Sequence, residues 1–264
     1  MKLVASAIVH NEADRYLVPW LEHLLSFCDD VILFDDHSTD DTRKIAFGYD
    51  GVTVIENTGP RFFANEAEAR NRLLEHTYRV NADYVLSIDA DEFIGNTDYL
   101  RSAIEGDKPV YAVTMREAWM VATTTAKTFG RWPNDLTITD RKIGLRVDGL
   151  WGDRRTHMLW KHPGPNVRGS VWKIPNRKLA CGREPLQVRR TKPVEAGLAV
   201  YHFGSTRVAE RQARADRYYE HDGGRFHADK HLQSLLDEDD VVGIDWQPWP
   251  VSIPPAVLDL ASRP

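Results

Sequence analysis

Short apolar runs alternate with segments of helical periodicity through residues 1–90. Short runs bounded by polar residues are typical of strands buried on both faces, and the periodic segments are typical of helices with one buried face. The predicted strands are 3–9, 31–34, 52–55 and 84–88. The predicted helices are 16–25, a short helix capped within 38–42, and 64–80. This β–α–β alternation predicts a mostly parallel sheet with helices on both faces.

The pattern becomes less regular after residue 109. The further elements that it predicts are strands at 110–115 and 199–204 and helices at 205–221 and 226–236. Tryptophans recur there without helical spacing, which favours loops whose rings stack on sugars or bases, with hydrophobic core as the alternative. They are Trp119, Trp132, Trp151, Trp160 and Trp172. The tail, rich in Trp and Pro, is predicted to run extended over the domain.

Polar side chains gather where the predicted strands end. They are His10 and Asn11 after the first strand, Asp35 and Asp36 after the second, and Asp89, Asp91 and Glu92 after the fourth. Parallel strands present their carboxyl ends at one edge of the sheet, where α/β proteins bind ligands. Crowded carboxylates need a cation or hydrogen-bond donors, although single acids of this kind also serve as turn or helix caps. We expect a divalent cation that holds a phosphorylated ligand, because no glycine-rich phosphate loop is present.

Composition describes an ordinary globular protein. The 264 residues are 42% hydrophobic and 28% charged. No apolar run approaches the roughly 18 residues needed to cross a bilayer, and the apolar start is interpreted as a core strand instead of a signal peptide. The two cysteines, Cys28 and Cys181, lack metal-ligand spacing and indicate a reducing compartment. These features predict a cytoplasmic location.

Charge is distributed unevenly along the chain. Residues 1–140 hold 13 Lys+Arg against 24 Asp+Glu, residues 141–192 hold 14 against 3, and residues 193–264 hold 7 against 12. We call residues 141–192 the basic block. It predicts an electropositive wall for phosphates or an anionic acceptor, and the alternative is that its arginines pair with the acidic N-terminal part.

Four motifs occur in one order within the first hundred residues. They are Ile-Val-His-Asn-Glu at 8–12, Asp-Asp-His-Ser-Thr-Asp-Asp-Thr at 35–42, Ala-Arg-Asn at 69–71 and Asp-Ala-Asp-Glu at 89–92. Together they resemble the family 2 glycosyltransferases, and the resemblance covers about the first third of the chain. It implies an α/β protein of the GT-A fold, a Rossmann-like nucleotide-binding mixed sheet flanked by helices, here with a C-terminal helical extension.

The resemblance implies a nucleoside-diphosphate sugar as donor, and we expect it to be uridine-linked. The nucleotide-binding residues would be His10, Asn11, Glu12, Asp36, Arg70 and Asp89. Asp36 would accept a hydrogen bond from the imide of a uracil-like base, with turn capping as the alternative. Arg70 would lie near the base and phosphates, since its planar fork suits both, with pairing to Glu66 on its own helix as the alternative.

The resemblance also implies a bound Mn²⁺ or Mg²⁺. Asp91 would bind the metal directly, and Asp89 would contact the ribose or a metal-bound water. His202 precedes a glycine at the end of a predicted strand, where related enzymes bring a late histidine to the metal or diphosphate. A lone histidine is more often structural, and His157 is a weaker competitor.

Enzymes of this class invert the anomeric centre, so a carboxylate should deprotonate the acceptor hydroxyl. The Glu-Asp acceptor motif of many members is absent from the second half of this chain. Asp153, in Trp-Gly-Asp-Arg-Arg, is our candidate base, and a turn aspartate paired with its own arginines is the alternative. Asp148 and Glu117 are the other candidates.

We therefore predict an inverting, metal-dependent glycosyltransferase. The predicted parts are a nucleotide-sugar-binding half at 1–108, an acceptor-binding half with basic loops at 109–204, and C-terminal helices with a Pro/Trp-rich tail at 205–264. The acceptor remains open between a glycan, a protein and a nucleic acid. The alternatives are a nucleotidyltransferase, disfavoured because no glycine-rich basic loop follows the first strand, and a nucleic-acid-binding module that uses the basic block.

Overall fold

The structure, a computed structural model, describes residues 1–122, 141–146, 154–164, 170–173, 181–221, 233–236, 244–245 and 252–262. The chain divides into two compact units that interleave along the sequence. The first unit comprises residues 1–90, 96–113 and 156–198, and the second comprises 91–95, 114–155 and 199–264. Three strands run from one unit into the other, namely β6 (Val110–Ala122), β8 (Arg154–Lys161) and β11 (Val194–His202).

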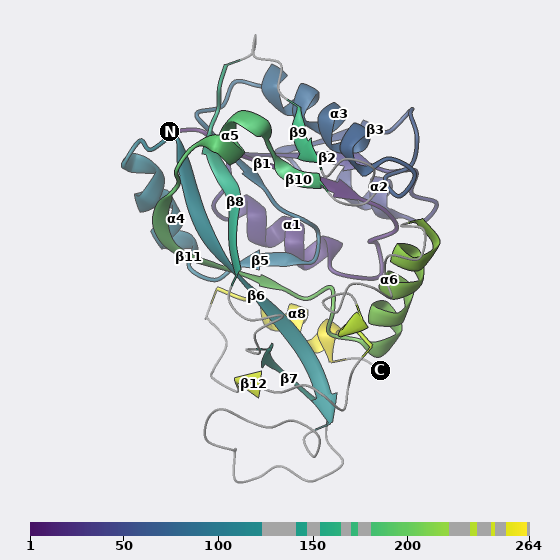
Figure 1. The fold of residues 1–264 in the computed structure, drawn as a ribbon. Coiled ribbons are helices and arrows are strands. Elements are labelled where there is room, and N and C mark those ends of the chain that lie inside the picture. Colours follow the sequence, from purple (N-terminus) through teal and green to yellow (C-terminus); the bar gives the residue numbers. More distant parts are fainter. Residues whose placement is uncertain are drawn as a thin grey trace. The chain divides into compact units, whose positions relative to one another are not determined.

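The first unit is built on a parallel sheet (Figure 1). Its parallel strands are β1 (Leu3–Val9), β2 (Asp30–Asp35), β3 (Val52–Glu56) and β4 (Tyr84–Ser87). The order across this part of the sheet is β8-β4-β1-β2-β3, and β8 is antiparallel to β4. Because Val9 pairs with Asp35 and Asp35 with Glu56, the carboxyl ends of β1, β2 and β3 lie at one edge.

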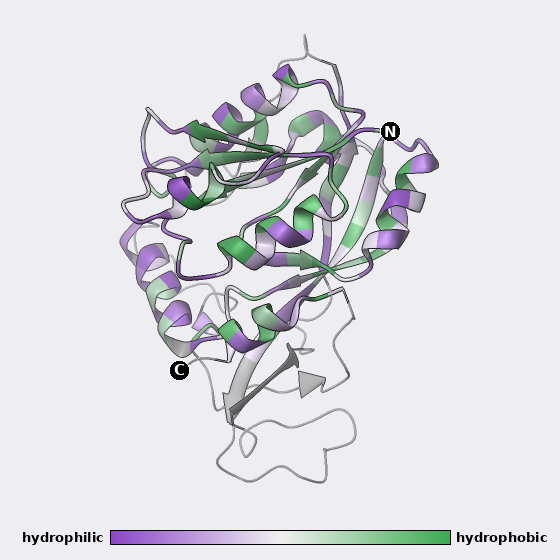
Figure 2. Ribbon diagram, turned by 180° about the vertical axis from the view of Figure 1, so that it is seen from behind, coloured by the Kyte–Doolittle hydropathy of each residue, from purple (hydrophilic) through white to green (hydrophobic). Residues whose placement is uncertain are grey.

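Helices cover both faces of this sheet. The helices of the first unit are α1 (Leu17–Leu25), α2 (Thr42–Ala46), α3 (Glu66–Arg79), α4 (Thr97–Glu105) and α5 (Leu186–Arg190), of which α1, α2 and α3 contact the parallel strands. Figure 1 shows α1 and α3 on opposite faces of the parallel strands. Alternation along β2 produces this arrangement, since Ile32 and Phe34 pack against Leu73 of α3. Figure 2 shows apolar residues concentrated in the strands, while the helices carry apolar and polar residues.

A short antiparallel pair packs against α3 within the first unit. It consists of β9 (Val171–Lys173) and β10 (Cys181–Pro185). Val171 joins Leu74 and Tyr78 of α3 in a buried cluster with Trp160, and the Val171 amide donates to Asn71 Oδ1 at 2.8 Å. Residues far along the chain therefore complete the covering of α3.

The second unit is organised by antiparallel pairs. Its other elements are β5 (Glu92–Ile94), β7 (Arg141–Arg146), β12 (Ile244–Asp245), α6 (Val208–His221) and α8 (Pro255–Ala261). The end of β11 pairs with β5, so that His202 lies opposite Glu92 and Tyr201 opposite Phe93. β6 pairs with β7 from Glu117 onward, and β7 pairs with β12.

The predicted mixed α/β sheet flanked by helices is confirmed, and α6 and α8 belong to the C-terminal extension. Two sequence interpretations need correction. Trp119 and Trp160 lie in β6 and β8 and are fully buried, so both are core residues and not exposed stacking surfaces. The tail is not wholly extended, because Pro254–Pro255 begins α8 and proline suits the first position of a helix.

Besides α8, the described elements absent from the prediction are β5, α4, β7, β8, β9, β10, α5 and β12. The predicted helix at 226–236 falls largely outside the described residues, as do Trp132 and Trp151. The functional division at 108 and 204 remains a prediction, since the two compact units follow a different, interleaved partition.

Candidate functional site

Two loops at the sheet edge of the first unit are bound to each other. Asn11, after β1, donates its backbone N–H to Ser38 Oγ at 3.0 Å and accepts the Thr39 amide on Oδ1 at 2.8 Å. His10 Nδ1 lies 2.7 Å from the backbone oxygen of Asp36. Asn11 and His37 adopt positive φ, 53° and 61°, which is uncommon outside glycine and is often found at binding sites. The structure thus brings His10, Asn11 and Asp36 together, as strand-end reasoning expected.

The Asp36 carboxylate is buried, 2% exposed, and both of its oxygens are hydrogen-bonded. Oδ1 accepts from Asn57 Nδ2 at 2.6 Å, and Oδ2 accepts from the Phe62 amide at 2.9 Å. These bonds fix the carboxylate against the loop that follows β3. Each carboxylate oxygen can accept a second bond, so a base imide remains chemically possible as a further partner.

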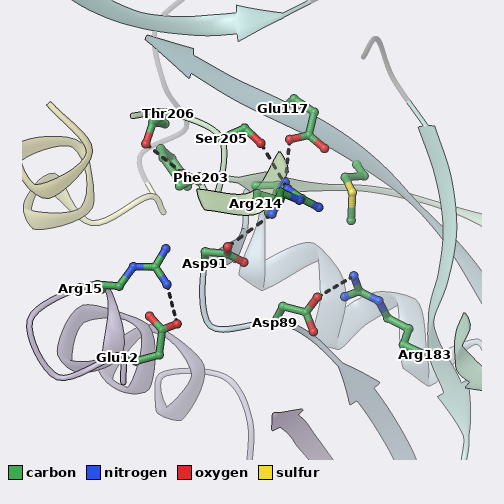
Figure 3. Close-up of polar contacts among 12 residues, drawn as sticks. Glu12, Arg15, Asp89, Asp91, Glu117, Arg183, Phe203, Ser205, Thr206 and Arg214 are labelled. Carbon is green, nitrogen blue, oxygen red and sulfur yellow. Dashed lines mark hydrogen bonds and ion pairs between the residues drawn. The ribbon is translucent and has the colours of Figure 1, made fainter. Parts of the chain in front are cut away.

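Glu12 joins the end of this loop to the protein core. It is 8% exposed, its amide donates to Thr42 Oγ1 at 2.8 Å, and its carboxylate binds Arg15 at 2.6 Å (Figure 3). These contacts give Glu12 a part in holding the loop, and its contact with a nucleotide remains a prediction.

Asp89, at the end of β4, is held by two arginines. Arg70 Nη1 lies 3.7 Å from Oδ1, and Arg183 Nη2 lies 3.2 Å from Oδ2 (Figure 3 draws the second contact). Arg70 also donates Nε to Glu66 at 2.9 Å, so the alternative intrahelical pair is present together with the contact to Asp89. Burial opposes its charge, but Asp89 and Glu66 outweigh burial and raise the pKa of Arg70. Sequence reasoning missed Arg183, because 94 residues separate it from Asp89.

The second unit places Asp91, His202 and Glu117 in one row. His202 Nε2 lies 3.5 Å from Asp91 Oδ2, and its Nδ1 lies 2.6 Å from Glu117 Oε2. Glu117 is fully buried and His202 is 6% exposed. Burial alone would lower the pKa of His202, but Glu117 and Asp91 raise it to about 10. Burial would raise the pKa of Glu117, yet His202 and Arg154 hold it below its usual value.

Strand pairing in this unit aligns the row. β11 pairs with β5 up to His202, and the Phe203 amide donates to the Asp91 carbonyl at 2.8 Å. Gly204 then leaves room beside the two side chains. A Cβ on Gly204 would lie 2.1 Å from Asp91 Oδ2 and 2.7 Å from His202 Nε2. Only a residue without a side chain fits there while Asp91 and His202 keep these positions.

Two arginines border the row. Arg154 of β8 binds Glu117 Oε1, the oxygen that does not face His202. Arg214 of α6 donates to Ser205 Oγ at 3.2 Å (Figure 3), and the negative charges of Glu117 and Asp91 help to raise its pKa against the effect of burial. The two carboxylates and two guanidiniums balance each other, so the net charge of the cluster follows the imidazole, whose raised pKa favours the protonated form.

The row offers two metal donors, Asp91 Oδ2 and His202 Nε2. Within the described parts of the chain, no three His, Cys, Asp or Glu side chains converge on one point. The two donors, brought together where Gly204 has no side chain, fit a cation that completes its coordination with substrate oxygens and water. A nitrogen donor suits Mn²⁺ better than Mg²⁺, which takes oxygen ligands almost exclusively.

The general-base candidates Asp153 and Asp148 lie outside the described residues. Glu117 has both oxygens bound by His202 and Arg154, which argues against a role in deprotonating an acceptor. His157 lies in the first unit, where burial lowers its pKa and Glu184 opposes that effect.

Several cations of the basic block form ion pairs. Their partners are Glu117 for Arg154, Asp107 for Lys161, Asp89 for Arg183 and Glu184 for Arg189. Arg154, Lys161 and Arg183 thus pair with acids of residues 1–140, which is the alternative arrangement, whereas the partner of Arg189 lies within the basic block. Arg190 and Lys192 are exposed.

Known proteins match mainly the N-terminal part of this chain. Residues 7–113 match the family model of glycosyl transferase family 2, which confirms the resemblance for this part of the chain. Uncharacterized proteins of Mycobacterium bovis and Mycobacterium tuberculosis are each 29% identical over 109 residues, covering 39% of this chain. The match spans only 26% of the length of either relative.

Solved structures align with this chain at low sequence identity and low TM-score. S. aureus TarS aligns over 90% of this chain and 70% of its own, with 16% identity and a TM-score of 0.44. The mannosyltransferase PcManGT from Pyrobaculum calidifontis, solved with GDP-Man and Mn²⁺, aligns over 42% of this chain and 34% of its own, with 26% identity and a TM-score of 0.31. Because these scores are low, the fold assignment rests on the strand order and the family match.

No helix in the described residues has the length and apolar character that a membrane span requires.

Proposed function

We propose that the protein is a nucleotide-sugar glycosyltransferase with a divalent metal site at Asp91 and His202. The convergence of these two donors beside Gly204 carries the proposal. Asp91 follows the fourth strand of the sheet, within the segment that matches family 2, whereas His202 and Gly204 come from the end of β11 and the residues after it. The bound metal would neutralise charge on the departing nucleoside diphosphate.

The remaining roles follow from the residues at the strand ends. Asp36, already oriented by Asn57 and Phe62, would accept the imide N–H of a uracil base. Arg70 and Arg183 would steady Asp89 beside the ribose. Asp153 remains our proposed base for the acceptor hydroxyl, with inversion at the anomeric carbon.

Donor hydrolysis tests the proposal without knowledge of the acceptor. A panel of UDP-, GDP- and CDP-sugars is incubated with Mn²⁺, Mg²⁺ or EDTA, and released nucleoside diphosphate is measured. We expect UDP release that requires the metal. Asp91→Asn should lower it by about 100-fold or more, because stabilisation of several kcal/mol depends on the metal. Asp98→Asn, an exposed residue in the first turn of α4, is the matched control.

The products separate the alternative functions. A nucleotidyltransferase would consume nucleoside triphosphate and release pyrophosphate instead of nucleoside diphosphate. A nucleic-acid-binding module would bind oligonucleotides equally well after Asp91→Asn, since phosphate contacts do not need a metal site. Hydrolysis that is equal in EDTA and unchanged by Asp91→Asn would contradict the proposed metal site.

A further inference from the structure

Glu117 is held from both sides in the buried part of the second unit. Arg154 binds its Oε1, and His202 Nδ1 lies 2.6 Å from its Oε2. β6 supplies Glu117 and β11 supplies His202, so two residues 85 positions apart in the sequence make this contact. A fully buried carboxylate between two cationic partners cannot turn away from the imidazole without losing a compensated charge.

We propose that Glu117 is a positioning residue that holds His202 in the orientation and tautomer required to bind the metal, an inference that rests on the proposed metal site. When a metal binds, it displaces the proton of Nε2, and a ring Nδ1–H that donates to a carboxylate leaves the Nε2 lone pair for the cation. His202 Nε2 is the atom on the Asp91 side, 3.5 Å from Oδ2. A carboxylate behind a ligating histidine also raises the basicity of the ligand and fixes its ring.

Arg154 contributes by fixing the carboxylate itself. Because it occupies Oε1, Oε2 remains directed at His202. In this arrangement Glu117 does not need to touch substrate. Removing the Glu117 carboxylate should therefore lower the metal affinity without deleting a metal ligand. Loss of such an outer contact typically costs about 10- to 100-fold in metal affinity.

Mn²⁺ binding tests the inference through readouts other than turnover. Mn²⁺ is titrated into the full chain, with and without UDP, and free Mn²⁺ is followed by electron paramagnetic resonance. Electron spin echo modulation then reports whether an imidazole nitrogen coordinates the bound ion. The variants are Glu117→Gln, Glu117→Ala, His202→Asn, Asp91→Asn and the double variant Glu117→Gln/His202→Asn. Glu210→Gln, a carboxylate paired with Arg207 at 2.6 Å in the same unit, is the matched control.

We expect Glu117→Gln to raise the Kd for Mn²⁺ about 10-fold and Glu117→Ala about 100-fold, with weaker nitrogen modulation in both. The double variant should bind no more weakly than His202→Asn alone, because both changes remove one function. Melting temperatures check folding, and Glu117→Asp, which keeps the charge but shortens the side chain, replaces any variant that does not fold.

The outcomes distinguish the inference from the proposed function. If His202→Asn weakens binding while Glu117→Gln and Glu117→Ala keep wild-type affinity and nitrogen modulation, the positioning role is wrong and the metal site stands. If Asp91→Asn and His202→Asn both leave Mn²⁺ binding unchanged with and without UDP, the metal site itself is wrong, and the role of Glu117 fails with it.

Discussion

Gly204 provides the space in which Asp91 and His202 approach each other. Gly204→Ala would place a methyl group 2.1 Å from Asp91 Oδ2, so Asp91 must move. We expect the variant to fold, since Asp91 is a partly exposed side chain, but to lose metal-dependent donor hydrolysis by about 10-fold or more, as misplaced catalytic groups do. Mn²⁺ titration and UDP release measure both effects.

Gly48→Ala is the control for this change, because its nearest neighbour is the Ile45 carbonyl at 3.2 Å and it lies in the other unit. Wild-type metal affinity in Gly204→Ala would show that the convergence of Asp91 and His202 is not used for metal binding.

Asp36 gives a second prediction at the scale of one residue. In Asp36→Asn, one amide N–H₂ would face a donor, either Asn57 Nδ2 or the Phe62 amide. An unsatisfied buried donor costs about 1–3 kcal/mol, which urea unfolding should reveal. Wild-type protein should also bind UDP more tightly than CDP or ADP by calorimetry, and Asp36→Asn should lose that preference.

Asp41→Asn is the matched control for stability, since Asp41 is exposed and its ion pair with Lys44 spans 3.8 Å. Equal affinity of the wild-type protein for all three nucleotides would exclude base reading by Asp36.

Residue-scale prediction worked where chemistry depends on strand ends. His10, Asn11 and Asp36 could be placed together from sequence, because neighbouring parallel strands end at the same edge. The partners Arg183 and Glu117 could not be placed from the sequence. Their contacts with Asp89 and His202 span 94 and 85 residues, and no local periodicity encodes such pairings.

At the scale of elements, the end of β11 determines where His202 lies. Phe203 follows it, is fully buried, and packs edge to face on Phe93 of β5 with ring centroids 5.7 Å apart. Phe203→Ala should lower the free energy of unfolding by about 3–5 kcal/mol, as large-to-small core changes do. Mn²⁺ affinity should fall as well. The Phe203 amide donates to the Asp91 carbonyl, so a backbone shift at residue 203 would also displace Asp91. Denaturant titration and Mn²⁺ binding check the two effects.

Phe203→Leu keeps most of the volume and should cost less than about 1.5 kcal/mol. A Phe203→Ala variant that is destabilised but binds Mn²⁺ like the wild type would show that β11 packing is not coupled to the metal site.

Long periodic elements were the predictable ones. The helix predicted at 64–80 is α3 at Glu66–Arg79, and the strand predicted at 3–9 is β1. β5 escaped prediction because three residues are too few for periodicity to show. α8 escaped because prolines were interpreted as extended chain, although Pro255 occupies a helical N-terminal position.

At the scale of the whole molecule, charge segregation along the sequence does not translate directly into a free basic surface. Of the fourteen cations in the basic block, seven have described side chains, and four of these pair with carboxylates. Arg154, in particular, binds the buried carboxylate of Glu117. A surface that attracts a polyanion must therefore depend on other members, of which Arg190 and Lys192 are exposed at the end of α5 and after it.

We expect Arg190→Glu and Lys192→Glu to weaken binding of an anionic polymer while leaving UDP binding unchanged. Polyphosphate and a single-stranded oligonucleotide are suitable probes, followed by fluorescence anisotropy between about 50 and 500 mM salt. Exposed charges are screened over about 10 Å at 0.1 M salt, so polymer affinity should fall steeply as salt rises. The affinity for the nucleotide, bound through a bridging metal, should change less with salt.

Arg79→Glu, which changes an exposed cation of α3 outside the basic block, is the control. Equal salt responses of polymer and nucleotide, or equal effects of Arg79→Glu and Arg190→Glu, would show that the basic block is ordinary surface.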